Sequence, residues 1–289
     1  MKIVIIGSSG QLGQEFFKLR SEHELIPLPH AEVEVESAES VRAALERHRP
    51  GMVINLAAYN QVDEAEDRPE RALGVNALGA FHAARAAAEV NAAVVFISTD
   101  YVFGAEPGRQ TPYRESDPPG PLGVYGVSKL AGEHLVRVAN PRHFIIRTCG
   151  LYGVATSHKG WTFPELMLKK AQAGEKLRVV QDQVLTPTYT RDLVRAVLAV
   201  MEKDRPGLYH LTSAGACSWY EFARATLELA GVRAELEPVS SEAFSARARR
   251  PAYSVLASER LSDLGLEGLR PWREALRAYL TEKGVIQKK

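Results

Sequence analysis

Three side chains of this chain could together move a proton onto a carbonyl oxygen, as the reduction of a ketone requires. Tyr125 and Lys129 stand four residues apart in the segment YGVSK, and Thr99 ends the apolar run AAVVFIST. Residues four apart lie on one face of a helix, so the phenol and the ammonium would be neighbours. A phenol has a pKa of about 10 in water, and we expect the ammonium to lower that pKa and ease proton exchange. Thr99 could donate a hydrogen bond to the substrate oxygen.

The Tyr-x-x-x-Lys spacing is not specific, because a second pair, Tyr279 and Lys283, occurs in YLTEK. Ten tyrosines in a chain of this length should give roughly 0.4 such pairs by chance. Tyr279 continues an apolar helical stripe with Leu276 and Leu280, whereas Glu282 and Lys283 are expected in solvent. We therefore interpret the second pair as core plus surface and the first as a candidate active site.

A glycine turn at the N-terminus predicts a dinucleotide site. Gly7, Gly10 and Gly13 directly follow the apolar run KIVII and open a helical segment. In this context Gly7 permits a tight turn, Gly10 lets the backbone approach a pyrophosphate, and Gly13 allows close packing of helix on strand. The helix N-terminus favours the negative pyrophosphate.

Apolar runs alternate with helical patterns along the first half of the chain. The expected strands are 2–7, 23–28, 51–57, 92–99 and 143–148, and the expected helices are 11–20, 37–48, 69–90 and 122–139. This order predicts a Rossmann-type, doubly wound parallel sheet of the α/β class. A long loop is expected at 104–123. In the second half of the chain we expect helices at 190–202, 218–231 and 271–284 and strands at 176–180 and 207–212.

The pattern also predicts two domains. Residues 1–150 should form a dinucleotide-binding domain, with sheet elements returning around 176–212, and residues 151–289 mainly a smaller substrate-binding lobe. Ligands of such sheets bind outside the carboxyl ends of the strands. Thr99, Tyr125 and Lys129 should therefore converge there, beside the dinucleotide.

Composition restricts the partners. The 289 residues are 45% hydrophobic and 25% charged, with a net charge of +1, which argues against nucleic-acid or membrane partners recruited by bulk charge. Cys149 and Cys217 show no metal-type spacing and are expected as buried thiols in a reducing compartment. The run IVII is too short for a signal sequence or a membrane span, so we expect a cytoplasmic protein.

Segments along nearly the whole chain resemble one enzyme family. They are GSSGQLG, VINLAAYNQVDEAE, NALGA, STDYVFG, GVYGVSKLAGE, IIRT, QDQVLTPT, GLYHLTSAG, SWYEFA and ARRPAYSVL. They are similar to the extended short-chain dehydrogenases/reductases, and most similar to the dTDP-4-dehydrorhamnose reductases. The resemblance implies reduction of the 4-keto group of dTDP-4-dehydro-L-rhamnose to dTDP-L-rhamnose with NADPH or NADH. It also implies a homodimer.

The resemblance assigns expected roles to individual residues. Gly10, Gln11 and Leu12 would hold the pyrophosphate through their backbone, and Tyr125 would donate the proton. The cofactor-binding residues implied are Gly7, Gly10, Gln11, Leu12, Gly13, Glu34, Val35, Ala57, Ala58, Tyr59, Asn76, Ile97, Tyr125 and Lys129. The sugar is expected to touch Thr99, Asp100, Tyr125 and Gly150.

The chain departs from the family pattern at two places. The family often has Arg-Thr-Ser-Trp after the fifth strand, with the Trp against the sugar, whereas Gly150 stands in that Trp position here. The adenine-side positions normally hold Asp and an aromatic residue, but here they are Glu34 and Val35. The second strand is followed by neither a clear acid for an NAD ribose nor an Arg for an NADP phosphate, so both cofactors stay open.

Other functions share part of the pattern. Dehydratases of the superfamily follow the Thr with Asp-Glu, whereas Thr99 and Asp100 are followed by Tyr101, which disfavours dehydration. Epimerases share the Tyr and Lys and retain NAD. The regulatory β subunit of methionine adenosyltransferase also resembles this family, and the loop YRESDPPGPLGVYG is similar to one found there. A non-catalytic regulatory subunit and an epimerase are therefore the alternatives to a reductase.

Overall fold

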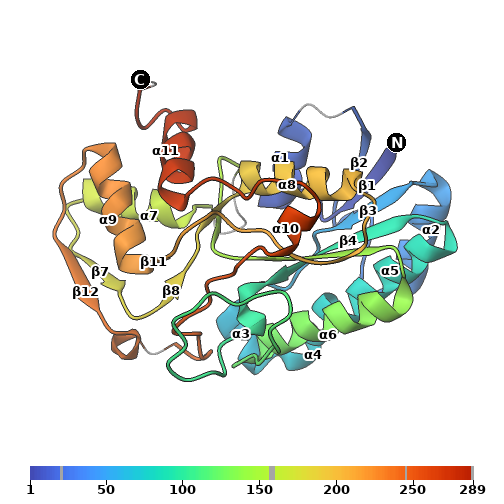
Figure 1. The fold of residues 1–289 in the computed structure, drawn as a ribbon, viewed down its shortest axis with the longest axis horizontal. Coiled ribbons are helices and arrows are strands. Elements are labelled where there is room, and N and C mark those ends of the chain that lie inside the picture. The colour runs from blue at the N-terminus through green and yellow to red at the C-terminus, as the bar shows by residue number, and fades with distance from the viewer. Residues whose placement is uncertain (20–21, 156–159, 245, 288–289) are drawn as a thin grey trace.

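The centre of the protein is a six-stranded parallel sheet, in the order β10-β5-β4-β3-β1-β2 (Figure 1). The computed structural model describes residues 1–19, 22–155, 160–244 and 246–287. The strands are β1 (Lys2–Ile6), β2 (Glu24–Leu28), β3 (Met52–Asn55), β4 (Ala93–Thr99), β5 (His143–Thr148) and β10 (Gly207–His210). The chain crosses over between β1 and β3, so the predicted doubly wound class is confirmed.

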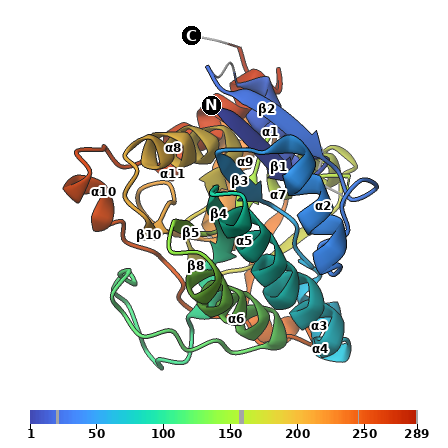
Figure 2. The same cartoon turned by 90° about the vertical axis from the view of Figure 1, so that its right-hand side faces the viewer.

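The strands are buried because helices cover both faces of the sheet (Figure 2). One face packs α1 (Gln11–Lys18) and α8 (Thr190–Glu202) over Ile3, Ile5 and Ile54. On the other face, the helices are α2 (Ala38–His48), α5 (Gly79–Glu89) and α6 (Val124–Ala139). The least buried strand of the sheet is β2, and its Pro27 is tolerated because β2 is an edge strand.

The helix predicted at 69–90 is interrupted. It consists of α4 (Pro69–Leu73), a π-helical turn (Gly74–Leu78) and α5. A π turn inserts extra backbone into a helix and often marks a functional position. Here the turn carries Asn76, which is fully buried. Helical periodicity alone does not detect this turn, nor did it predict the short α3 (Val62–Asp67) before it.

The second half of the chain forms a lobe with its own aromatic core, at the left of Figure 1. Its helices are α7 (Phe163–Gln172), α9 (Trp219–Ala230) and α11 (Trp272–Glu282), and its parallel strand pair is β7 (Leu177–Val180) with β12 (Leu236–Val239). The strand expected at 176–180 is thus found, but outside the main sheet, because Leu177 and Val179 pack on this lobe's core. By contrast, β10 joins the main sheet beside β5.

Short elements connect the sheet to the lobe. They are β6 (Leu151–Tyr152), β8 (Val184–Leu185), β9 (Thr188–Tyr189), β11 (Cys217–Ser218) and α10 (Arg260–Asp263). The pairs are β6 with β9 and β8 with β11. Both cysteines are buried free thiols, as expected. Within the described residues, no helix is long and apolar enough to cross a lipid bilayer.

Candidate active site

A cavity of about 1310 Å³ lies at the carboxyl ends of the central strands, and residues from the second lobe complete its wall. It collects nearly all of the predicted site residues. Those that line it are Gly7, Gly10, Gln11, Leu12, Gly13, Glu34, Val35, Ala57, Ala58, Tyr59, Ile97, Thr99, Asp100, Tyr125, Lys129 and Gly150. Residues separated by more than 100 positions in the sequence therefore line one cavity. Among the predicted site residues, Asn76 does not line it.

The glycine turn forms the wall at the end of β1. Gly7 has a φ of +76°, and a Cβ there would lie 2.9 Å from the backbone nitrogen of Ala57. A Cβ on Gly13 would lie 2.4 Å from the carbonyl oxygen of Ser8, so any side chain would push α1 off the turn. Gly10 caps α1 without a side-chain hydrogen bond, and the first turn holds no acid. The free N–H groups of this helix end suit a phosphate.

The adenine-side wall carries charges of both signs. Glu34 accepts a hydrogen bond from the backbone of Glu36 at 3.1 Å and lies 3.6 Å from the imidazole of His30. Arg71 lines the same cavity. Val35 is buried against α5, where a Cβ on Gly79 would lie 2.9 Å from its side chain. This end of the cavity is therefore lined by two carboxylates, Glu34 and Glu36, and by two potential cations, His30 and Arg71.

Asn76 lies behind the cavity wall rather than in it. Its side chain accepts a hydrogen bond from the backbone nitrogen of Tyr59 at 2.9 Å and donates one to the carbonyl of Tyr59 at 3.0 Å. It also donates to the hydroxyl of Ser128 at 2.9 Å. Asn76 therefore ties the loop after β3 to the helix that carries Tyr125, and its contact with the cofactor stays a prediction.

The start of α6 is fixed by two neighbouring segments, α3 and the residues after β4. The carboxylate of Glu66, on α3, accepts a hydrogen bond from the backbone of Val124 at 2.8 Å. A negative charge at this position stabilises a helix N-terminus. A Cβ on Gly126 would lie 2.2 Å from the carbonyl of Tyr101, so α6 packs closely on the residues after β4. The rings of Tyr101 and Tyr125 then meet edge to face, with centroids 5.8 Å apart.

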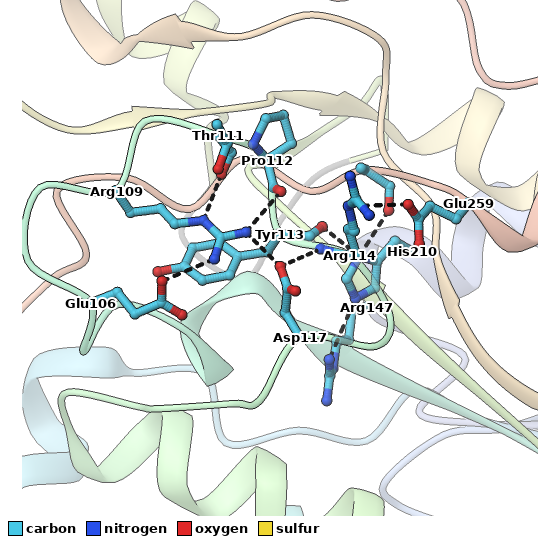
Figure 3. A network of polar contacts seen from close by, with 11 residues as sticks. Glu106, Arg109, Thr111, Pro112, Tyr113, Arg114, Asp117, Arg147, His210 and Glu259 are labelled. Atoms are coloured by element: carbon cyan, nitrogen blue, oxygen red, sulfur yellow. Dashed lines mark hydrogen bonds and ion pairs between the residues drawn. The ribbon is translucent and has the colours of Figure 1, made fainter.

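The long loop at 104–123, which leads into α6, is held by a polar network (Figure 3). Arg109 donates hydrogen bonds to the carbonyls of Thr111 and Pro112 and pairs with Asp117 at 2.5 Å. Its guanidinium also lies 4.2 Å from the ring centroid of Tyr113. The loop is therefore ordered by its own side chains, which supports the position of Tyr125 at its end.

Burial changes the pKa of both α6 residues. It raises the pKa of Tyr125 to about 12, and the charge of Asp100 adds to this, although a hydrogen bond with Thr99 opposes it. The expected lowering of this phenol pKa is therefore wrong, because burial outweighs the opposing effects. Burial also lowers the pKa of Lys129 to about 7, although Glu133 opposes the shift. The ammonium lies 4.1 Å from the ring centroid of Phe96. A protonated Tyr125 is the form that can donate a proton.

Thr99 and Asp100 form a buried polar pair at the end of β4. The hydroxyl of Thr99 donates to Asp100 at 3.1 Å and accepts from the backbone nitrogen of Tyr101 at 3.2 Å. The other carboxylate oxygen accepts hydrogen bonds from Cys149 at 3.0 Å and Ser254 at 2.6 Å. Burial raises the pKa of Asp100. These partners fix Asp100, which in turn orients the Thr99 hydroxyl.

Sequence reasoning missed the part of the wall that belongs to the second lobe. Trp161, Thr162 and Phe163 line the cavity together with Gly150. Thr162 caps α7 in a capping box with Glu165, and this Thr-x-x-Glu signal is readable in the sequence. Nothing in the sequence indicates that the start of α7 lines the same cavity as Gly150, since that position depends on how the lobe packs.

The second Tyr-x-x-x-Lys pair lies away from the cavity but supports this wall. Tyr279 is buried in the lobe core, as expected, and its hydroxyl lies 3.0 Å from that of Thr162. Lys283 pairs with Glu165 at 2.5 Å, and Glu282 pairs with Arg191. Glu282 and Lys283 are exposed, as expected, and both also find ion-pair partners far away in the sequence.

The doubly wound sheet, the glycine turn and a helix that brings tyrosine and lysine to one cavity define the extended short-chain dehydrogenase/reductase class. A family model described as the RmlD substrate binding domain matches residues 1–285. The chain belongs to this family.

Relatives with assigned names match over most of their length. The chain is 41% identical to the dTDP-4-dehydrorhamnose reductase of Mycolicibacterium smegmatis over 279 residues, covering 95% of this chain and 84% of that protein. It is 40% identical to the spore coat polysaccharide biosynthesis protein SpsK of Bacillus subtilis, with 98% of each covered. These relatives confirm the resemblance to dTDP-4-dehydrorhamnose reductases.

Solved structures agree with the fold. The crystal structure of a dTDP-4-dehydrorhamnose reductase from Clostridium acetobutylicum is similar with a TM-score of 0.92 and 38% identity, covering 98% of this chain and 99% of that one. The enzyme from Bacillus anthracis, solved in complex with NADP, has a TM-score of 0.92 and 34% identity, with 97% and 99% covered.

Proposed function

We propose that this protein is an NADPH- or NADH-dependent reductase that converts dTDP-4-dehydro-L-rhamnose to dTDP-L-rhamnose. The observation that carries the proposal is the meeting of Thr99, Tyr125 and Lys129 in the same cavity as the glycine turn. The named relatives support it, because several of them are dTDP-sugar ketoreductases.

The cavity fits a nicotinamide dinucleotide. The uncapped start of α1 and the glycine turn accept a pyrophosphate, and no side chain could be added at Gly7 or Gly13 without a clash. Ala57, Ala58 and Tyr59 would line the nicotinamide side, while Glu34 and Val35 would flank the adenine end. When bound, the cofactor supplies the hydride.

The protein's own residues handle the proton. Tyr125 is protonated at neutral pH, as an ordinary phenol already is, and its pKa of about 12 keeps it so over a wider pH range; its hydroxyl can therefore donate to the developing alkoxide at C4 of the sugar. Thr99 and Asp100 would hold the sugar, with the Thr99 hydroxyl turning from Asp100 to donate its hydrogen bond to the same oxygen. Lys129 would bind the nicotinamide ribose and place a positive charge next to Tyr125 when protonated.

The substrate class follows from the relatives. A relative from Streptomyces antibioticus, 38% identical, is a probable 4-ketoreductase of a different dTDP-sugar. The likeness to UDP-glucose 4-epimerases is at 19% and 21% identity and concerns the fold alone. A reductase is therefore favoured over an epimerase, with a dTDP-4-keto-6-deoxyhexose as the substrate class.

The domain organisation, the oligomeric state and the cellular location of the protein are part of the same proposal. Residues 1–150 would bind the dinucleotide and residues 151–289 mainly the sugar, in a cytoplasmic homodimer without nucleic-acid or membrane partners. Light scattering on the purified protein tests the dimer, because a monomer at micromolar concentration would contradict it.

The test of the reaction is direct. Purified protein is mixed with dTDP-4-dehydro-L-rhamnose and either NADPH or NADH, and the absorbance of the reduced nicotinamide is followed. We expect oxidation of one or both cofactors with formation of dTDP-L-rhamnose. An epimerase would carry bound NAD and consume no added cofactor, and a regulatory subunit would consume none and would bind an adenosyltransferase. No consumption with either cofactor would overturn the proposal.

A further inference from the structure

Residues 252–257, which we call the strap, run between β8 and the loop at 104–123. Val184 of β8 exchanges two backbone hydrogen bonds with the strap, at 2.8 and 2.9 Å. Tyr113 of the loop, labelled in Figure 3, exchanges two more with it, both at 2.8 Å. A strand inside a parallel sheet bonds its two neighbours in the same way. The strap is therefore fixed along both edges by segments that lie far away in the sequence.

Ser254 lies in the middle of the strap and contacts the active site from behind the cavity wall. It is 3% exposed and does not line the cavity. Its hydroxyl donates a hydrogen bond to Oδ2 of Asp100 at 2.6 Å, whereas the thiol of Cys149 donates to the same oxygen at 3.0 Å. A thiol is a weak donor, and a hydroxyl on a carboxylate makes one of the stronger hydrogen bonds in a protein. Ser254 is therefore the better donor to Oδ2, and a fixed backbone holds it there.

The two oxygens of Asp100 have different partners. Oδ2 accepts from Ser254 and Cys149, whereas Oδ1 accepts from the hydroxyl of Thr99 at 3.1 Å. In the proposed reaction the Thr99 hydroxyl turns to the substrate oxygen, so Oδ1 loses this side-chain donor. A buried carboxylate oxygen that loses a donor is costly unless another donor replaces it. Since Asp100 lines the cavity, a hydroxyl group of the sugar can take that place.

We propose that Ser254 is a positioning residue for the reduction, because it holds Oδ2 of Asp100 and so leaves Oδ1 to accept the sugar hydroxyl next to the keto group. The inference rests on the proposed function, since that substrate supplies a hydroxyl at this position. The sugar is then held at two neighbouring atoms, with its keto oxygen on Tyr125 and Thr99 and its hydroxyl on Asp100. Two such contacts fix the orientation of the ring, on which the rate of the chemical step depends. Ser254 itself touches neither the substrate nor the cofactor.

Steady-state kinetics of the full-length Ser254→Ala protein test the inference, with dTDP-4-dehydro-L-rhamnose and the nicotinamide cofactor that the wild type uses. We expect kcat/KM for the sugar nucleotide to fall about tenfold, because the carboxylate loses its fixed orientation, while KM for the cofactor stays within about twofold of wild type. General damage to the fold would change both parameters. Ser254→Thr keeps the hydroxyl and Ser254→Val has nearly the same shape without it, so kcat/KM should be higher for Ser254→Thr by a similar factor. This pair decides the question if Ser254→Ala does not fold.

Ser213→Ala is the matched control. Ser213 is also 3% exposed, its hydroxyl has no hydrogen-bond partner among the described residues, and it does not line the cavity. Its substitution should leave the kinetic parameters unchanged. A fall of less than about threefold for Ser254→Ala, equal values for Ser254→Thr and Ser254→Val, or an equally large fall for Ser213→Ala would overturn the role of Ser254. A wild-type protein without turnover with either cofactor would overturn the proposed function instead.

Discussion

Lys129 should make the stability of the protein depend on pH in a defined way. Its side chain is 2% exposed, and burial lowers its pKa from 10.5 to about 7. In the unfolded chain the amine returns to its ordinary value. Between these two pKa values the unfolded chain binds one more proton than the folded protein, so raising the pH favours folding. Below about pH 7 the amine is protonated in both states, and its contribution stops changing.

The size of the effect follows from the two pKa values. Between about pH 7 and about pH 9, Lys129 alone should raise the free energy of unfolding by about 2 kcal/mol. Lys129→Met keeps the length of the side chain and removes the proton. The wild type and this variant share all their other titrating groups. In the difference between their free energies of unfolding, the contributions of those groups therefore cancel.

Urea unfolding, followed by tryptophan fluorescence at several pH values, measures this difference. The wild type should gain stability relative to Lys129→Met as the pH rises. Lys176→Met is the matched control, because Lys176 is exposed and the carboxylates of Glu235 and Glu237 raise its pKa, so it stays charged throughout. A difference between wild type and Lys129→Met that is flat, or that falls with pH, would refute the reasoning about Lys129.

Three further substitutions test other parts of the site. Gly13→Ala should lower the melting temperature and the NADPH affinity, because its Cβ would lie 2.4 Å from the carbonyl of Ser8; an unchanged melting curve would contradict this packing. Glu133→Gln should lower the free energy of unfolding in urea by about 3–5 kcal/mol, because it leaves Arg147 buried without its 2.7 Å ion pair. A decrease below about 1 kcal/mol would show that the ion pair is dispensable for stability. Glu34→Gln should lower the KM for NADPH more than that for NADH, because it removes a negative charge that would repel the extra phosphate; an unchanged ratio of the two KM values would place that phosphate elsewhere.

The sheet and the cofactor half of the site were predictable because their signals are local. The apolar strand runs, the glycine spacing and the Tyr125–Lys129 pair each lie within one short segment. Parallel strands then bring their carboxyl ends together whatever the details of packing. The π turn at Asn76 was not predictable, since it leaves the apolar pattern of the helix intact while it moves one side chain inward.

The second lobe was predicted less well because its contacts are long-range. Trp161 lines the cavity from the segment that enters α7, and the sequence carries no signal of that position. Lys283 pairs with Glu165 across more than 100 residues of chain. The raised pKa of Tyr125 was also missed, since it comes from burial and from Asp100 at the end of β4 rather than from the spacing to Lys129.

The most direct test of the account removes only the hydroxyl of Tyr125. Turnover of dTDP-4-dehydro-L-rhamnose is compared for wild type, Tyr125→Phe and the control Tyr220→Phe, which changes a tyrosine of α9 outside the cavity. If Tyr125 donates the proton, kcat of Tyr125→Phe should fall by about 10²–10⁴ while its NADPH affinity stays close to that of wild type. Turnover by Tyr125→Phe within a few-fold of wild type would contradict the central claim.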